Sequence, residues 1–160
     1  MRKIYLIVCA LVCAGGLFGQ ENVEVPLDND RSWDIFYEDE NVILSSLTKL
    51  CEDPAGGPSA NYVFISLNNK KEGDVLIGWH YDIYNSLECI SCIDSDDEYN
   101  FEYTLASGQS IIPNCDFKNI VIDNGGKTIF FSIYLSQAKK QSDNDVVRLE
   151  LTNLITNFSE

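Results

Sequence analysis

A ten-residue segment in the middle of the chain alternates between apolar and more polar side chains: Val75-Leu76-Ile77-Gly78-Trp79-His80-Tyr81-Asp82-Ile83-Tyr84. Side chains of an extended strand point alternately to opposite sides, so every second residue falls on one face. The apolar face consists of Val75, Ile77, Trp79, Tyr81 and Ile83. This period predicts an antiparallel strand with one face in the core and one face toward water.

The same period of two recurs at residues 63–67, 99–105, 129–135 and 147–151, and residues 33–37 and 42–44 predict a hairpin. Stretches rich in Pro, Gly and Asn separate these segments, as at residues 53–58 and 124–126. No segment shows the pattern of a helix of ten or more residues, although residues 44–50 fit either a short helix or a strand. The pattern predicts an all-β protein, a two-sheet antiparallel β-sandwich of about seven to eight strands.

Residues 62–113 resemble the middle of an immunoglobulin-like (Ig-like) or fibronectin-like sandwich. Their order is a strand, an Asn-rich turn, a strand with Trp79, a loop and a further strand. They end near Leu105-Ala106-Ser107-Gly108-Gln109-Ser110, which resembles the L-x-x-G-x-S segment of bacterial Ig-like domains. Residues 22–160 as a whole are similar to small exported proteins of marine flavobacteria. The resemblance implies an Ig-like fold, and it implies no functional residue.

The chain is acidic, with 11 Lys and Arg against 25 Asp and Glu in 160 residues and a net charge of −14. A nucleic-acid binder needs a basic patch, so we expect no nucleic-acid partner. Two bases, an apolar run over residues 4–13 and small residues up to Gly19 predict a signal peptide at residues 1–19. Residues 20–160 then form a single β-sandwich domain that is secreted or periplasmic. No later apolar run has the length of a transmembrane helix.

Lipid anchoring at Cys13 is an alternative to simple export. A lipoprotein signal places a small residue immediately before the lipidated cysteine, and here that residue is Val12. The segment therefore favours cleavage after Gly19 over lipidation of Cys13.

Four cysteines follow the signal segment: Cys51, Cys89, Cys92 and Cys115. An even number in an exported chain predicts disulfides. Cys89 and Cys92 are close enough in sequence to form a local pair, which leaves Cys51 for Cys115, and a Cys51–Cys89 link is the alternative. A redox C-x-x-C or a four-cysteine zinc site would also use these residues. No helix pattern follows Cys92 and there is only one C-x-x-C pair, so we favour structural disulfides.

His80 is the only histidine, and it shares a strand face with Asp82. A Ser–His–Asp hydrolase would need such a pair, but no G-x-S-x-G nucleophile motif accompanies it. We therefore expect a partly exposed strand histidine and no catalytic residue. Paired carboxylates are the other hydrolytic chemistry that so acidic a chain offers. An acidic run follows Cys92 and contains Asp94, Asp96, Asp97 and Glu98. It is a candidate calcium site, because Ca²⁺ prefers oxygen ligands.

Aromatic residues on the polar strand faces predict either a binding platform or the inward face of a second strand register. They are Phe36, Tyr84, Phe130 and Tyr134. Together these features predict an exported, disulfide-stapled, non-catalytic module with a binding or structural accessory role and a protein or glycan partner. The alternative is a secreted hydrolase that uses acidic residues or His80. Apart from the calcium candidate, no cofactor is expected.

Overall fold

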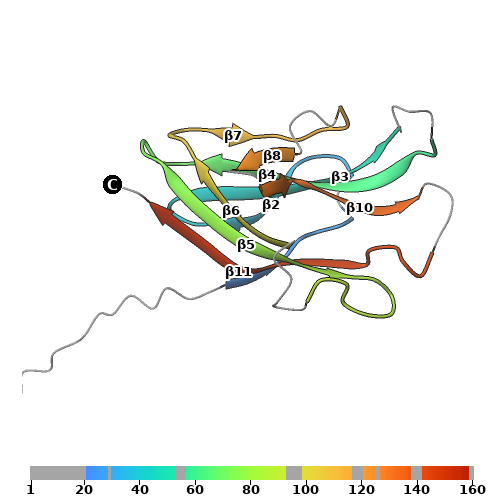
Figure 1. The fold of residues 1–160 in the computed structure, drawn as a ribbon. Helices are drawn as coiled ribbons and strands as arrows, with labels where there is room; N and C mark the ends of the chain where they lie inside the picture. The colour runs from blue at the N-terminus through green and yellow to red at the C-terminus, as the bar shows by residue number, and fades with distance from the viewer. Residues whose placement is uncertain are drawn as a thin grey trace, which may run out of the picture.

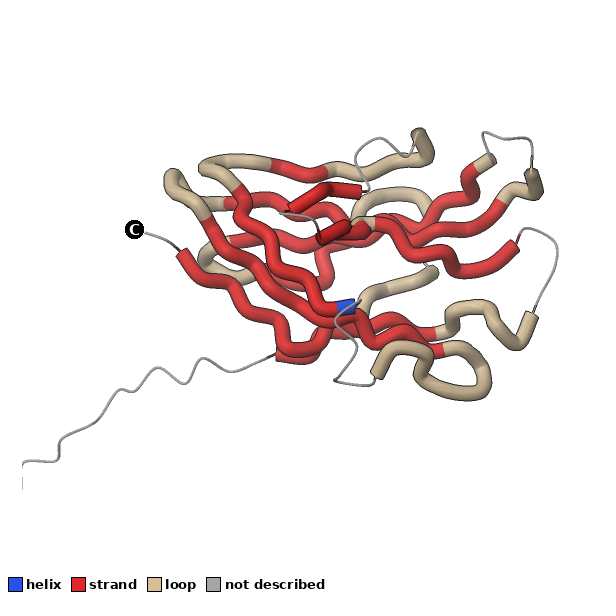
Figure 2. Tube along the Cα trace, viewed as in Figure 1, coloured by secondary structure: helices blue, strands red, loops and turns tan. Residues whose placement is uncertain are grey.

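The computed structural model describes residues 21–28, 30–52, 57–92, 99–116, 121–124, 127–137 and 142–158. These residues form eleven β-strands and no α-helix, and nine of the strands belong to two antiparallel sheets. Figure 1 and Figure 2 show the two sheets as stacked layers. The predicted two-sheet antiparallel β-sandwich is therefore confirmed. No helix in the described part of the chain is long and apolar enough to cross a membrane.

One layer is a four-stranded sheet in the order β1–β11–β5–β6. Its strands are β1 (Glu21–Glu24), β5 (Val75–Tyr84), β6 (Asn100–Leu105) and β11 (Arg148–Phe158). The other layer is a five-stranded sheet in which β10, β4, β3 and β2 lie side by side and β7 also pairs with β4. These strands are β2 (Asp34–Glu38), β3 (Val42–Cys51), β4 (Ala60–Asn69), β7 (Ser110–Ile111) and β10 (Ser132–Gln137). A separate two-stranded ribbon joins β8 (Val121–Asn124) to β9 (Lys127–Phe130).

The alternate side chains of β5 fill the space between the sheets, as their period predicts. Trp79 is almost fully buried, and its ring lies 5.7 Å from that of Phe101 and 6.1 Å from that of Phe131. The hydroxyl of Tyr81 donates to the backbone oxygen of Phe130 at 3.1 Å. Burial raises the pKa of Tyr81, so this phenol stays neutral.

Residues 129–135 do not form the single strand that their alternation predicts. β9 ends at Phe130 and β10 begins at Ser132, while the backbone oxygen of Phe131 accepts a hydrogen bond from the amide of Ile65 at 2.9 Å. Ile129 and Phe131 are both fully buried, so the hydrophobic pattern continues across the break and cannot reveal it. Residues 44–50 lie within β3, which settles them as strand rather than helix.

Asp39 connects the turn between β2 and β3 to the far end of β11. Its Oδ1 accepts hydrogen bonds from the amides of Asn41 and Val42 at 2.7 and 2.8 Å, and its Oδ2 accepts one from the hydroxyl of Thr156. Tyr37 donates to the same Oδ2 at 3.2 Å. Burial acts to raise the pKa of Asp39, but these hydrogen bonds outweigh it and hold the pKa below the ordinary 3.8.

The Asp39 network predicts an acid-sensitive contribution to stability. Because the pKa of Asp39 is lower in the folded than in the unfolded chain, its contribution is complete above 3.8 and is lost as the pH falls below it. We expect Asp39→Asn to lower the free energy of unfolding by about 2 kcal/mol at pH 7 and to flatten its decline below pH 4. Urea unfolding from pH 2 to 7 measures this. The exposed neighbour Glu40→Gln is the control, and equal losses in both variants would contradict the assignment.

Two disulfides join the described cysteines in the pairing that the sequence favours. Cys51 and Cys115 are 64 residues apart in sequence with Cα atoms 5.4 Å apart. Cys89 and Cys92 are 3 residues apart, with Cα atoms 5.7 Å apart. Such bonds persist in oxidising compartments outside the cytoplasm, so they fit an extracytoplasmic protein.

The long disulfide packs in a second, smaller apolar cluster with Phe64, Trp33 and Tyr62. Phe64 lies between Val63 and Ile65 of the main core, so its side chain points to the opposite face of β4. Phe64 is nevertheless fully buried. The Cys51–Cys115 bond therefore fastens the segment after β7 to the end of β3 beside this outer cluster.

The two disulfides differ in the length of chain that they close, and their contributions to stability should differ accordingly. In the chain-entropy treatment, the long bond contributes about 4 kcal/mol and the local bond about 2 kcal/mol. We expect the double variant Cys51→Ser, Cys115→Ser to lose roughly twice as much unfolding free energy as Cys89→Ser, Cys92→Ser. Urea denaturation of the oxidised proteins tests this, and a larger loss from the local pair would contradict it.

Candidate functional site

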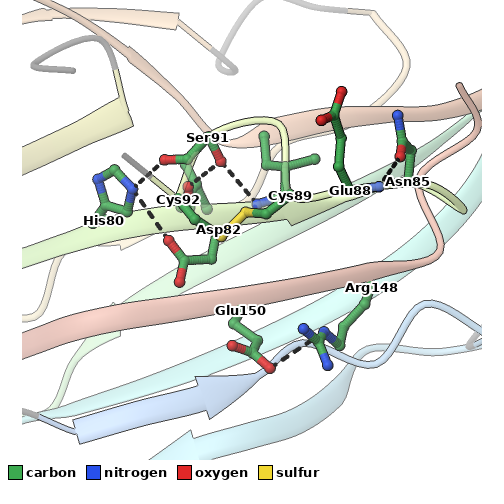
Figure 3. The surroundings of a disulfide bond; sticks show 11 residues. His80, Asp82, Asn85, Glu88, Cys89, Ser91, Cys92, Arg148 and Glu150 are labelled. Atoms are coloured by element: carbon green, nitrogen blue, oxygen red, sulfur yellow. Dashed lines mark hydrogen bonds and ion pairs between the residues drawn. A yellow bond between two sulfur atoms is a disulfide. The ribbon is translucent and has the colours of Figure 1, made fainter. Parts of the chain in front are cut away.

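His80 is buried beneath the loop of residues 85–92, although the sequence predicted a partly exposed side chain. It lies on the face of β5 opposite Trp79 and is only 3% exposed. Figure 3 shows the loop turning back so that Ser91 lies over His80. The prediction was wrong because strand alternation places a side chain on a face, but it does not show what a later loop puts on top of that face.

Both ring nitrogens of His80 have close polar neighbours. Nδ1 lies 3.1 Å from Oδ1 of Asn100, and Nε2 lies 2.8 Å from the backbone oxygen of Ser91 and 3.2 Å from Oδ1 of Asp82. Nε2 faces two oxygens that can only accept hydrogen bonds, so we assign a ring proton to Nε2. The side-chain amide of Asn100 can present either its oxygen or its nitrogen to Nδ1, so this contact does not fix the protonation of Nδ1. A proton held at Nε2 makes this nitrogen a donor to the loop and not a base for a hydroxyl group.

The hydroxyl of Ser91 is committed to the backbone of β5. It accepts a hydrogen bond from the amide of Ile83 at 2.8 Å and donates to the backbone oxygen of Tyr81 at 2.6 Å. Of the two oxygens of Ser91, the backbone oxygen is the one that is hydrogen-bonded to His80, as Figure 3 shows. The Ser91–His80–Asp82 group thus resembles a hydrolase triad in composition. Its hydrogen bonds instead form a structural clamp that holds the loop of residues 85–92 against β5.

Residues 85–92 are braced along their whole length. The side chain of Asn85 accepts hydrogen bonds from the amides of Leu87 and Glu88, each at 2.8 Å. Cys89 pairs with Tyr84, the amide of Ile90 donates to the backbone oxygen of Ile83 at 2.7 Å, and the disulfide closes the loop at Cys92. These bonds fasten the segment to the end of β5.

A second loop, residues 142–147, lies against the first. The hydroxyl of Ser86 donates to the backbone oxygen of Asp143 at 3.0 Å, and the amide of Val147 donates to the backbone oxygen of Tyr84 at 2.9 Å. We call residues 85–92 and 142–147 the two-loop end. It carries three exposed apolar side chains: Leu87 (74%), Ile90 (47%) and Val147 (59%).

Two open hollows meet at Val147. One, of about 510 Å³, is lined by Ser86, Ser142, Asp143, Asp145 and Val147. The other, of about 540 Å³, is lined by Val147 and Arg148 together with residues 24–28. The guanidinium of Arg148 lies 3.6 Å from the ring centre of Tyr84 and 3.4 Å from Oε1 of Glu150.

The predicted aromatic platform is not assembled as one surface. Phe130 and Tyr134 are 41% and 44% exposed. Phe36 packs against the main core, and Tyr84 is half-buried beneath Arg148. The four residues therefore serve different parts of the fold.

The calcium candidates Asp94, Asp96, Asp97 and Glu98 lie outside the described residues, as does Cys13. Within the part of the chain that the structure describes, no three His, Cys, Asp or Glu side chains are grouped to hold a metal ion. Comparisons of this chain with protein-family models, curated proteins and solved structures found no match. Its function must therefore be argued from these residues alone.

The clamp at Ser91 predicts a large stability loss on removing one oxygen atom. Ser91→Ala leaves the amide of Ile83 and the backbone oxygen of Tyr81 buried without partners, which costs about 2–4 kcal/mol. Ser86→Ala removes only an exposed hydrogen bond and should cost about 0.5 kcal/mol or less. Urea unfolding compares the two, and amide exchange should accelerate at Ile83 in the first variant alone. Equal costs would refute the clamp.

Proposed function

We propose that the protein is an exported, non-catalytic recognition module that binds its partner through the two-loop end. The observation that carries the proposal is the exposure of Leu87. Its side chain is 74% exposed, although hydrogen bonds hold the loop residues before and after it. A single exposed leucine is ordinary on a protein surface. What distinguishes this one is that a disulfide, an Asn85 cap and pairing to β5 hold it in place.

Rigid presentation matters for binding because ordering a loop at the moment of contact costs free energy. At the two-loop end the loops are already held in place in the free protein, by the bonds within residues 85–92 and by the Ser86–Asp143 contact. Little further ordering is therefore needed on binding. The fully buried core of a protein interface is more apolar than its rim. Leu87 and Val147, on adjoining loops, provide that core.

Export is the second part of the proposal. Residues 1–19 act as the signal peptide, and the described disulfides fit the oxidising environment to which such a signal leads. The mature chain then folds outside the cytoplasm as a disulfide-stapled sandwich.

The geometry at His80 supports a non-catalytic role over the hydrolase alternative. Its Nε2 faces two oxygen acceptors, and the hydroxyl of Ser91 is used by the backbone of β5. A hydrolytic His must instead accept a proton from a nucleophile or a water molecule.

Esterase, glycosidase and peptidase substrates should all remain uncleaved, and cleavage abolished by His80→Gln would overturn the proposal.

Photo-crosslinking in the native envelope tests the binding surface directly. A photoreactive amino acid at position 87 or 147 should give one discrete adduct, and introducing Ser at position 87 should weaken the adduct formed from position 147. Ile35 is 56% exposed on β2, an edge strand of the other sheet, and is the matched control position. Adducts of equal yield from positions 35 and 87 would count against the two-loop end.

A further inference from the structure

We propose that the partner of the two-loop end is a protein surface that presents basic side chains around an apolar pocket. This inference rests on the proposed function and specifies the chemistry of the partner. It is carried by the charge of the groups that surround Leu87 and Val147.

In the described residues, carboxylates line both hollows beside Val147, and one follows Leu87 in the sequence. Asp143 and Asp145 line one of the hollows beside Val147, and Glu24 and Asp28 line the other. Glu88 stands next to Leu87 and is exposed. The candidate calcium residues of the acidic run and the pair Lys139 and Lys140 lie outside the described residues.

Among the described residues that line these hollows, the only base is Arg148, and its charge is compensated by a carboxylate of its own strand. Arg148 forms an ion pair with Glu150 and stacks on the ring of Tyr84. Its charge is therefore directed back toward β5 and β11 and does little to cancel the carboxylates around Val147. The surface that remains is an apolar centre with a negative rim.

Such a surface favours a partner of opposite charge, because complementary charges around an apolar centre speed association and exclude wrong partners. Anionic lipid surfaces and nucleic acids carry the wrong sign. A basic protein surface complements the negative charge of the rim, and an apolar pocket in that surface buries the side chain of Leu87. Burying Leu87 fully on binding should strengthen the complex by about tenfold or more.

The test uses a synthetic amphipathic peptide of leucine and lysine as the probe, with the oxidised mature protein and isothermal titration calorimetry. We expect the wild type to bind this peptide and not the counterpart in which glutamate replaces lysine. Leu87→Ser should weaken binding about tenfold or more, and rising salt should weaken it further. Ile35→Ser should bind like the wild type. Because Leu87 is 74% exposed, the melting temperature of its variant should not change.

Several outcomes would overturn the inference. They are no binding of the basic peptide, equal binding by the Leu87→Ser variant, or equal binding of the acidic peptide. Binding to phosphatidylcholine vesicles in place of the peptide would assign the surface to a membrane. If the peptide fails while crosslinking from position 87 still succeeds, the basic partner is wrong and the proposed function stands. If both fail, the proposed function falls as well.

Discussion

The packing of β5 against the opposite sheet is the constraint on which the remaining structure depends. β5 has a neighbouring strand on each side, and its alternate side chains reach across the interior to groups of the other layer. Trp79 and Tyr81 reach Phe131 and the backbone at Phe130, where the chain passes from β9 to β10. A shift of β5 by one residue would bring His80 and Asp82 into this interior and remove Trp79 from it.

The polar face of the same strand explains the character of the candidate site. His80 is fixed in place by the register that buries Trp79, and the loop that follows β5 covers it with Ser91. Burial of a polar group is tolerable only when its hydrogen bonds are satisfied, and Asn100, Ser91 and Asp82 satisfy those of His80. The polar residues of β5 thus stabilise the loop, and the tip of that loop, where the proposed recognition surface lies, stays exposed.

Local patterns predicted most of the fold. Alternation in β5 and the spacing of Cys89 and Cys92 both report short-range geometry, and the structure agrees with both. The burial of His80 and the break at Phe131 depend on contacts between segments distant in sequence, so no local pattern contains them. Leu87 carried no signal either, because one apolar residue in a polar loop has no period; only its supporting bonds distinguish it.

The position of β11 has a consequence for how the molecule is made. This strand is the last in the chain, yet it lies inside its sheet between β1, the first strand, and β5. The layer therefore cannot close until β11 is in place, and pairing of β1 waits for it. Contacts between segments so far apart in sequence slow the folding of a chain, because the long loop between them must be closed first. Loss of residues 148–158 would leave β1 and β5 with no strand between them.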